Sequence, residues 1–236
     1  MPHAMPVRWL VDPETNRALW RDLSDMPLRL VDGPDATVVD LGGGSGSFAG
    51  VLLRKGARVI TIDVDLPSLK AVAPGVHPVS GSLLALPFRD GAFDAVAGRA
   101  ILHHVPDALD AAFAEAKRVV KPGGRLLFQE PTSGNRLADV ARRRFPTERH
   151  DPHERPLPLA AYVDAARRHF EILDVRAFFL LSYLLPHLVG RIPPDRRNLG
   201  RAFARAVSAW DARSLAALPG LGGRAAYVSI LARRRE

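Results

Sequence analysis

The sequence contains no cysteine among its 236 residues. This absence excludes disulfide bonds, thiolate metal sites and mechanisms that use a cysteine nucleophile, and it is consistent with a cytoplasmic location. A sustained apolar segment is also missing from residues 1–10, which therefore do not resemble a secretory signal. The most apolar region, residues 178–192, is interrupted by serine, proline, histidine and glycine. It is shorter than the ~20 apolar residues that cross a bilayer.

Lysine is scarce, with four residues, so the formal net charge of +8 arises mostly from arginine. A strongly basic chain raises the question of a nucleic-acid partner. However, the arginines are scattered in short groups such as 142–144 and 233–235. No aromatic residues alternate with them, as a single-strand binding platform requires. We therefore interpret the arginines as solvated helix surfaces, and nucleic acid is not a favoured partner.

Glycine, by contrast, is concentrated in one place. Residues 38–46, VVDLGGGSG, form a short apolar stretch that ends in Asp40 and then breaks into a loop made almost entirely of glycine. Glycine permits positive φ and lets the backbone approach a ligand where a β-carbon would collide. The next apolar run, residues 59–62, again ends in an acid, Asp63. Two neighbouring parallel strands would therefore bring carboxylates to the same edge of a sheet, which suits a ribose diol.

The glycine loop fits two cofactor motifs. In one register, Gly44-x-Gly46-x-x-Ala49 matches a relaxed dinucleotide fingerprint. In the other register, Asp40-x-Gly42-x-Gly44-x-Gly46 resembles motif I of the class I S-adenosylmethionine-dependent methyltransferases. The loop alone leaves both interpretations open.

Three later segments favour the second register. In chain order they are LPFRDGAFDAV at 86–96, ILHHV at 101–105 and KPGGRLLF at 121–128. Together with the loop, they resemble the small-molecule methyltransferases of the ubiquinone and menaquinone type. The resemblance is close over residues 36–131, and AAYVSIL at 225–231 resembles the last, antiparallel strand of that family.

The resemblance implies an α/β fold with a Rossmann-like, seven-stranded, mostly parallel sheet, an antiparallel last strand and helices on both faces. The apolar runs agree with it, because strands that alternate with helices and are apolar throughout belong to a parallel sheet covered on both faces. We predict strands at 36–41, 58–63, 76–80, 93–98, 125–129 and 171–177, helices that begin at Pro13, Leu109 and Leu159, and a later helix that carries Leu199, Phe203, Val207 and Trp210.

We expect one domain over residues 1–236, because this length suffices for one α/β domain and is short for two. Residues 36–131 would form the cofactor-binding core. Residues 132–158 and 178–222 would form a loop and a helical cap on the acceptor side, with the cap inserted between strands six and seven. The apolar character of the cap suggests a small-molecule acceptor with apolar surface, and a homodimer stays open.

The resemblance also implies which residues hold S-adenosylmethionine. Asp40 would fix the ammonium group of its methionine part, and Asp63 would hold the ribose hydroxyls. The family usually has Gly-Asp-Ala after the third strand, but here the sequence is Gly81-Ser82-Leu83, so the contact with the adenine amino group would be weaker or made by backbone. Arg99 would neutralise the methionine carboxylate or point to solvent. The expected cofactor-binding residues are Asp40, Gly42, Gly43, Gly44, Asp63, Val64, Ser82, Leu83, Gly98 and Arg99.

Methyl transfer from a sulfonium is an in-line displacement with an activated donor, so the protein mainly aligns the reactants and excludes water. An oxygen acceptor must lose its proton, and histidine has a suitable pKa for taking it. The candidate catalytic residues are His103, Glu130 and His153. A packing role is the alternative for His103 and a solvated loop for His153, whereas Glu130 would be a base or an anchor for the acceptor. No metal is expected, because His150 and His153 have no thiolate partner.

The sequence therefore predicts an enzyme that uses S-adenosylmethionine to methylate a small molecule. Oxygen is the favoured acceptor atom, with nitrogen or carbon as alternatives. An NAD-dependent oxidoreductase is a further alternative, although the chain has no Tyr-x-x-x-Lys motif. An RNA methyltransferase and a non-catalytic cofactor-binding protein also stay open.

Overall fold

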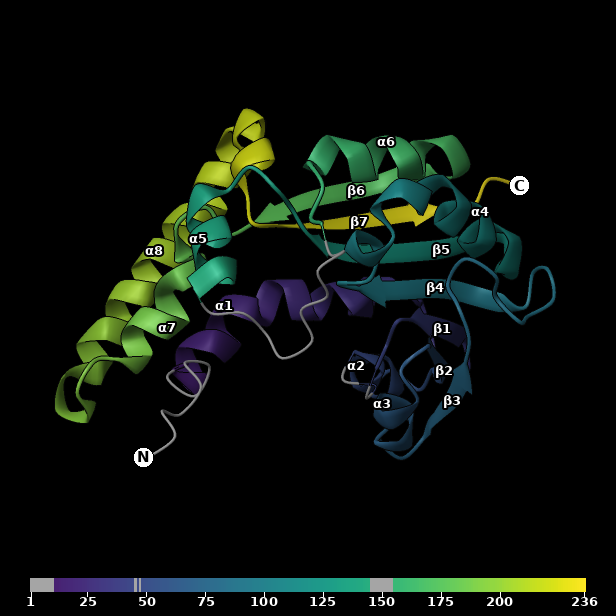
Figure 1. The fold of residues 1–236 in the computed structure, drawn as a ribbon, viewed down its shortest axis with the longest axis horizontal. Helices are drawn as coiled ribbons and strands as arrows, with labels where there is room; N and C mark the ends of the chain where they lie inside the picture. The colour runs from purple at the N-terminus through teal and green to yellow at the C-terminus, as the bar shows by residue number, and fades with distance from the viewer. Residues whose placement is uncertain (1–10, 45, 47, 145–154) are drawn as a thin grey trace.

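The computed structural model describes residues 11–44, 46, 48–144 and 155–236, and its centre is a seven-stranded sheet. The strand order is β3-β2-β1-β4-β5-β7-β6, and β7 runs antiparallel to both of its neighbours. This order confirms the predicted fold (Figure 1). The strands are β1 (Thr37–Leu41), β2 (Arg58–Asp63), β3 (Val76–Ser80), β4 (Phe93–Arg99), β5 (Val120–Pro131), β6 (Glu171–Phe178) and β7 (Tyr227–Arg233).

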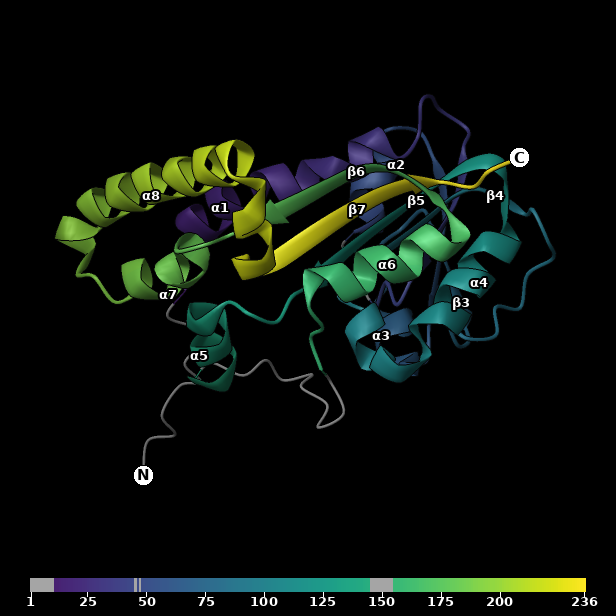
Figure 2. The same cartoon turned by 90° about the horizontal axis from the view of Figure 1, so that it is seen from above.

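Helices cover both faces of the sheet. α4 and α6 lie on one face, whereas α1 and α2 lie on the other (Figure 2). α5, α7 and α8 gather beyond the carboxyl ends of the parallel strands (Figure 1). The helices are α1 (Pro13–Asp25), α2 (Ala49–Leu53), α3 (Leu66–Lys70), α4 (Leu109–Val119), α5 (Arg136–Arg144), α6 (Leu159–His169), α7 (Leu185–Gly190) and α8 (Arg197–Ala217).

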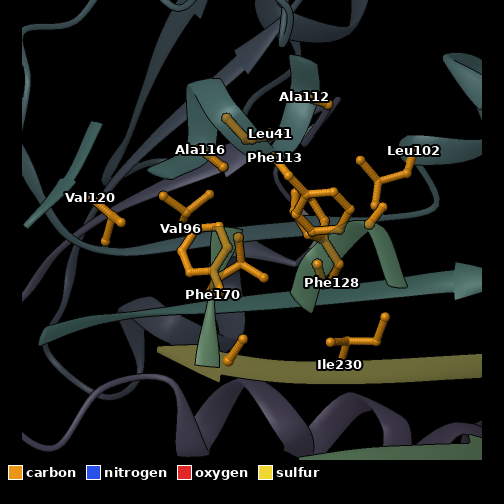
Figure 3. Packing of buried hydrophobic residues seen from close by; sticks show 14 of the residues in the cluster. Leu41, Val96, Leu102, Ala112, Phe113, Ala116, Val120, Phe128, Phe170 and Ile230 are labelled. Atoms are coloured by element: carbon orange, nitrogen blue, oxygen red, sulfur yellow. The ribbon is translucent and has the colours of Figure 1, made fainter. Parts of the chain in front are cut away.

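The main core lies between the sheet and the helices α4 and α6. As predicted, α4 places an apolar stripe at helical spacing against the sheet, and its small alanines let the helix approach closely. Phe113 of α4 meets Phe128 of β5 edge to face, with ring centroids 5.4 Å apart, a geometry that stabilises aromatic pairs beyond burial alone. Figure 3 shows this cluster, which Leu41, Val96 and Ile230 extend across three strands.

β5 begins earlier than predicted, at Val120 rather than at Arg125. The register between β4 and β5 shifts at an irregularity, so the segment after α4 enters the sheet directly. Gly123 in this segment has a φ of +73°. Its N–H donates to the carbonyl of Arg234 at 3.0 Å. The glycines that were expected to stop the helix therefore lie inside the strand, and α4 ends before them, at Val119.

The longest helix, α8, presents its apolar side outward. An apolar helix face normally packs inward, and the sequence predicts one on α8. In the structure, Leu199, Phe203 and Trp210 are 78%, 62% and 52% exposed, and Val207 alone of the predicted four packs toward α7. The side of α8 that contacts α1 and α7 carries small residues such as Ala204. Within the described ranges, no helix has the length and apolar character that a membrane crossing requires.

Asp211 anchors α8 to the end of β6. It is 3% exposed, and its carboxylate accepts hydrogen bonds from the backbone N–H groups of Leu180, Leu181 and Ser182 at 2.8, 3.0 and 2.9 Å. The hydroxyl of Ser182 donates to the same carboxylate at 2.5 Å. Phe179, just before this loop, has a φ of +67°, which is unfavourable for a bulky residue. The carboxylate therefore stabilises a chain reversal that the local sequence disfavours.

Removing this carboxylate would leave three backbone N–H groups without an acceptor. Because hydrogen bonds to charged groups contribute about 1.5–3 kcal/mol each, we expect Asp211→Ala to lower the free energy of unfolding by roughly 3–5 kcal/mol in urea denaturation. Asp195, whose side chain is 73% exposed, provides the control. Asp195→Ala should change the same quantity by less than about 0.5 kcal/mol. Equal stability of the two variants would contradict the anchoring role.

Candidate functional site

The glycine loop follows β1 and is tied to β2. β1 pairs in parallel with both β2 and β4, so the carboxyl ends of these strands meet at one edge. The N–H of Gly42 donates to the carbonyl of Ile62 at 2.8 Å. The N–H of Gly44 donates to Oδ2 of Asp63 at 2.9 Å. The predicted loop therefore lies against the acid that ends β2.

Side chains would not fit at Gly42 and Gly43 of this loop. Gly42 has a φ of +64°, and a β-carbon on it would lie 2.3 Å from Cδ1 of Ile101. A β-carbon on Gly43 would lie 2.1 Å from Oγ1 of Thr61 and 2.4 Å from Oδ2 of Asp40. Close packing as well as backbone conformation therefore requires glycine here.

Asp40 is buried beside the loop without a hydrogen bond. Its exposed fraction is 0%, and neither carboxylate oxygen has a partner among the described residues. Burial raises the pKa of Asp40 to about 7; the positive charge of Arg99 partly offsets this rise, and Asp63 adds to it. Burying an unpaired carboxylate is costly. The position is therefore suited to a ligand group that is cationic or donates hydrogen bonds.

Arg99, at the end of β4, is the cationic counterpart. Its Nε donates to Oε1 of Gln129 at 2.9 Å, and its guanidinium carbon lies 4.5 Å from the centre of the Phe48 ring. Its Nη2 is buried and has no partner in the described part of the chain. Burial lowers the pKa of Arg99, and the nearby Tyr227 and Asp40 oppose this effect. The site thus holds a carboxyl group and a guanidinium, each with hydrogen-bonding atoms that no described residue uses.

Asp63 ends β2 and is partly buried. Its Oδ2 accepts from Gly44, and its Oδ1 accepts from the N–H of Asp65 at 2.9 Å. Each carboxylate oxygen can accept a second hydrogen bond, so both keep capacity for a ligand hydroxyl. Val64 follows with 73% exposure and offers an open apolar surface.

The remaining predicted residues lie after β3 and in β4. β3 ends beside Asp63 in the sheet, so the loop that carries Ser82 and Leu83 starts at the same edge. Oγ of Ser82 accepts a hydrogen bond from the N–H of Leu84 at 3.2 Å, and Leu83 packs partly against the main core. Gly98 is required by close packing, because a β-carbon there would lie 2.4 Å from the ring of Phe128.

Glu130 and His103 form a buried pair. Glu130 is 0% exposed, and its carboxylate accepts the backbone N–H groups of Ile101 and Leu102, both at 2.9 Å. Its Oε2 lies 3.0 Å from Nδ1 of His103. When Nδ1–H donates to this carboxylate, Nε2 is the basic nitrogen of a neutral ring. Glu130 therefore orients His103 and holds the turn after β4.

His153, the third candidate base, and His150 lie outside the described residues. Among the residues that the structure does describe, no group of three or more histidine, aspartate and glutamate side chains is placed to hold a metal ion.

No sequence motif indicates the aromatic cluster near Arg99. The Trp20 ring of α1 lies with its centroid 5.0 Å from that of Tyr227 in β7 and 4.8 Å from that of Phe179 after β6. Tyr183 stacks on Tyr227 with centroids 6.5 Å apart. Three distant segments supply these rings, and Tyr227 acts electrostatically on Arg99. Only the fold brings them together.

Gln129 is a second residue that the sequence does not single out. Besides accepting from Arg99, it donates from Nε2 to the carbonyl of Leu23 at 2.6 Å. It therefore links β4, β5 and α1 beside the site. Its position directly before Glu130, at the end of a predicted strand, is the one signal that could have found it.

A cavity of about 260 Å³ lies between α1 and α8, away from the glycine loop. Its walls include Leu19 and Ala204, and charged residues such as Arg21 and Arg205 also line it. None of its lining residues belongs to the predicted cofactor-binding set, so this cavity is separate from the site described above.

Comparison with known proteins agrees with this geometry. Residues 39–128 match the family model of the methyltransferase domain. This segment is therefore similar to a methyltransferase domain. Asp40, Asp63 and Arg99 all lie within it, and the match confirms the resemblance drawn from the sequence motifs.

Part of the chain also resembles curated proteins. It is 42% identical over 101 residues to the demethylmenaquinone methyltransferase of Thermobifida fusca, and this match covers 39% of the present chain and 42% of the relative. The chain thus matches less than half the length of that relative.

Solved structures resemble the chain over nearly its whole length. One is the geranyl diphosphate C-methyltransferase of Streptomyces coelicolor A3(2), with 19% identity, a TM-score of 0.63 and coverage of 97% of this chain and 89% of that one. Another is the [4+2]-cyclase SpnF, with 21% identity and a TM-score of 0.63; the match covers 91% of this chain and 80% of that one. At these identities the likeness shows a shared fold.

The unpaired Asp40 should make the stability of the protein depend on pH. Because its pKa is raised from 3.8 to about 7, the folded protein keeps a proton that the unfolded chain releases within this range. The free energy of unfolding should therefore fall as the pH rises from about 4 to about 7, by at most about 4 kcal/mol.

Asp40→Asn should remove this part of the pH dependence. Urea denaturation of the ligand-free protein at about pH 5 and about pH 8 measures it. The variant should be the more stable protein at the higher pH, since no buried charge forms there. A pH profile identical to that of the wild type would contradict the unpaired burial of Asp40.

Proposed function

We propose that this protein is an S-adenosylmethionine-dependent methyltransferase that methylates an oxygen atom of a small acceptor with apolar surface. The observation that carries the proposal is the pair of opposite charges, Asp40 and Arg99, with hydrogen-bonding atoms that no described residue uses. The geranyl diphosphate C-methyltransferase of similar fold was crystallised with S-adenosyl-L-homocysteine, which supports this choice of cofactor.

The two charges fit the methionine part of the cofactor, which is a zwitterion. The carboxylate of Asp40 would accept hydrogen bonds from the ammonium group, and Nη2 of Arg99 would donate to the carboxylate group. Charge-assisted hydrogen bonds of this kind are stronger than neutral ones. They would also stabilise the ionised form of Asp40, whose pKa is raised mainly by burial and further by Asp63. When bound, the cofactor supplies a methyl group already activated on a sulfonium.

The neighbouring residues suit a nucleoside. Asp63 would accept hydrogen bonds from the ribose hydroxyls, and the exposed Val64 would lie beside the adenine, with Ser82 and Leu83 opposite. A dinucleotide fits less well, because its pyrophosphate would bring negative charge toward Asp40 and Asp63. These contacts favour S-adenosylmethionine over NAD.

Calorimetric titration with S-adenosylhomocysteine tests the cofactor site. We expect Asp63→Ala and Gly44→Val each to weaken binding by at least about tenfold. The first variant loses hydrogen bonds to a charged group. The second places a side chain where the ligand would approach the backbone. Asp90→Ala removes an exposed carboxylate outside the site and should bind as the wild type does. Unchanged affinity in both site variants, or tighter binding of NAD than of S-adenosylhomocysteine, would refute the proposal.

We assign the removal of the acceptor's proton to His103. Two observations support this role. The buried carboxylate of Glu130 fixes the ring at Nδ1, which leaves Nε2 as the base. His103 also lies only four residues after Arg99, the last residue of β4. Glu130 is a positioning residue in this scheme, because its oxygens are occupied by backbone N–H groups and His103. His153 stays a further candidate on the acceptor-side loop.

The aromatic cluster supports an acceptor with a flat or apolar surface. The rings of Trp20, Tyr183 and Tyr227 contact one another, and Tyr227 acts electrostatically on Arg99. The guanidinium carbon of Arg142 lies 5.6 Å from the centre of the Tyr183 ring. Aromatic side chains contribute large apolar contact areas with defined geometry. Residues 178–222, which supply Tyr183, would act as the cap over such an acceptor.

Transfer to carbon is the second candidate. It is favoured by the similarity of fold to an enzyme named as a geranyl diphosphate C-methyltransferase. A carbon acceptor that loses a proton as the new bond forms would need a base as well, so His103 would keep the same role.

His103→Gln tests the base. The amide can still hydrogen-bond Glu130 but has no basic nitrogen, so kcat should fall by about 10²–10⁴ while the affinity for S-adenosylhomocysteine is unchanged. Release of S-adenosylhomocysteine from S-adenosylmethionine is measured with a panel of phenols, hydroxyquinones and isoprenoid diphosphates as acceptors. The exposed neighbour provides the control as His104→Gln. An unaltered kcat and pH profile in His103→Gln would exclude this histidine as the base.

A further inference from the structure

The outward side of α8 carries an apolar surface that nothing in the described part of the chain covers. Leu199, Phe203, Ala206 and Trp210 follow one another at spacings of four, three and four residues, which puts them on one side of a helix. All four are exposed. Isolated exposed apolar residues are ordinary, but a continuous set that includes leucine, phenylalanine and tryptophan marks an interaction surface. We call this set the outer stripe.

The opposite side of α8 is already engaged. Asp211 is bound by the loop after β6, and Ala204 packs against α7. Arg201 donates to the carboxylate of Asp12 at 2.9 and 3.1 Å, which lowers the pKa of Asp12 to about 2. α1 and α7 lie on this inner side of α8 at the edge of the molecule (Figure 2). Rotating α8 to bury the outer stripe would break these contacts, so the stripe faces outward as a consequence of the fold.

The exposed charge of α8 is positive only. Arg205 and Arg213 are exposed and form no ion pair within the described ranges. Asp211, the one acid in the α8 sequence, is buried and hydrogen-bonded. Two copies of this chain that met through the outer stripe would therefore bring arginines near arginines. Anionic lipid headgroups, by contrast, would attract these residues.

We propose that α8 docks on the surface of a bilayer that contains anionic lipids. Leu199, Phe203 and Trp210 would insert at the boundary between headgroups and acyl chains, and the arginines would lie at the headgroups. A helix that combines exposed aromatic and aliphatic residues with exposed arginines is typical of segments that lie in the plane of the membrane interface. The inference does not depend on the proposed methyl transfer, because it uses only the outer surface of α8.

Flotation of the whole chain with lipid vesicles tests the proposal. Vesicles of phosphatidylcholine with about 30% phosphatidylglycerol should carry the protein upward at low salt, and vesicles of phosphatidylcholine alone should carry much less, because the attraction is partly electrostatic. The double variant Leu199→Gln/Phe203→Gln should bind the anionic vesicles at least about tenfold more weakly. The double variant Arg205→Gln/Arg213→Gln should bind the anionic vesicles about fivefold more weakly for each charge removed.

Leu66→Gln is the matched control, because Leu66 lies on α3 and is 54% exposed. It should float as the wild type does. Glutamine is a good helix former, and equal thermal unfolding of all variants checks that the fold is kept.

Three results would overturn the proposal. The wild type could fail to float with anionic vesicles, or the outer-stripe double variant could float as well as the wild type. Light scattering could also show a dimer that the same double variant converts to a monomer, which would assign the outer stripe to a second copy of the chain.

Discussion

A buried carboxylate needs hydrogen-bond donors, and this requirement organises the carboxyl edge of the sheet. Glu130 and Asp211 meet it with the backbone N–H groups of the turn after β4 and of the loop after β6. Asp63, partly buried, does the same with the glycine loop. In each case the acid and the loop belong to different elements, so the hydrogen bonds fix segments far apart in the sequence. Charge-assisted bonds are strong enough to hold such loops, including one that contains Phe179 at positive φ.

Asp40 is the exception at this edge. It is as buried as Glu130, but the N–H groups of its own loop are used elsewhere, by Ile62 and by Asp63. Arg99 completes the pattern with one unpaired nitrogen. The fold supplies hydrogen-bond donors to the carboxylates of Glu130 and Asp211, but none of the described residues donates to the carboxylate of Asp40. Such local inconsistencies in an otherwise satisfied structure are expected where a ligand binds.

The parts of this protein that depend on local sequence could be predicted, and those that depend on tertiary packing could not. β2 and β3 have the predicted bounds, because apolar runs and turn residues are local signals. The helix that carries Leu199, Phe203, Val207 and Trp210 was predicted, but its orientation was not, because periodicity shows that a helix has an apolar side and not which side is buried. Small residues such as Ala204 and the anchor Asp211 decide which side packs. The contacts of Gln129 likewise require α1 and β4 to be in place.

The shared fold does not decide the reaction, since an enzyme named as a [4+2]-cyclase has the same architecture. The choice must therefore come from the side chains at the glycine loop. If this edge served only the shape of the protein, a neutral residue at position 40 would stabilise it, because burial raises the pKa of Asp40 and makes its charged form unfavourable. A ligand that brings an ammonium group to that carboxylate, and a carboxylate to Arg99, would offset the cost at both positions. An amino-acid-bearing nucleoside meets both conditions, whereas a dinucleotide has no ammonium group to bring to Asp40.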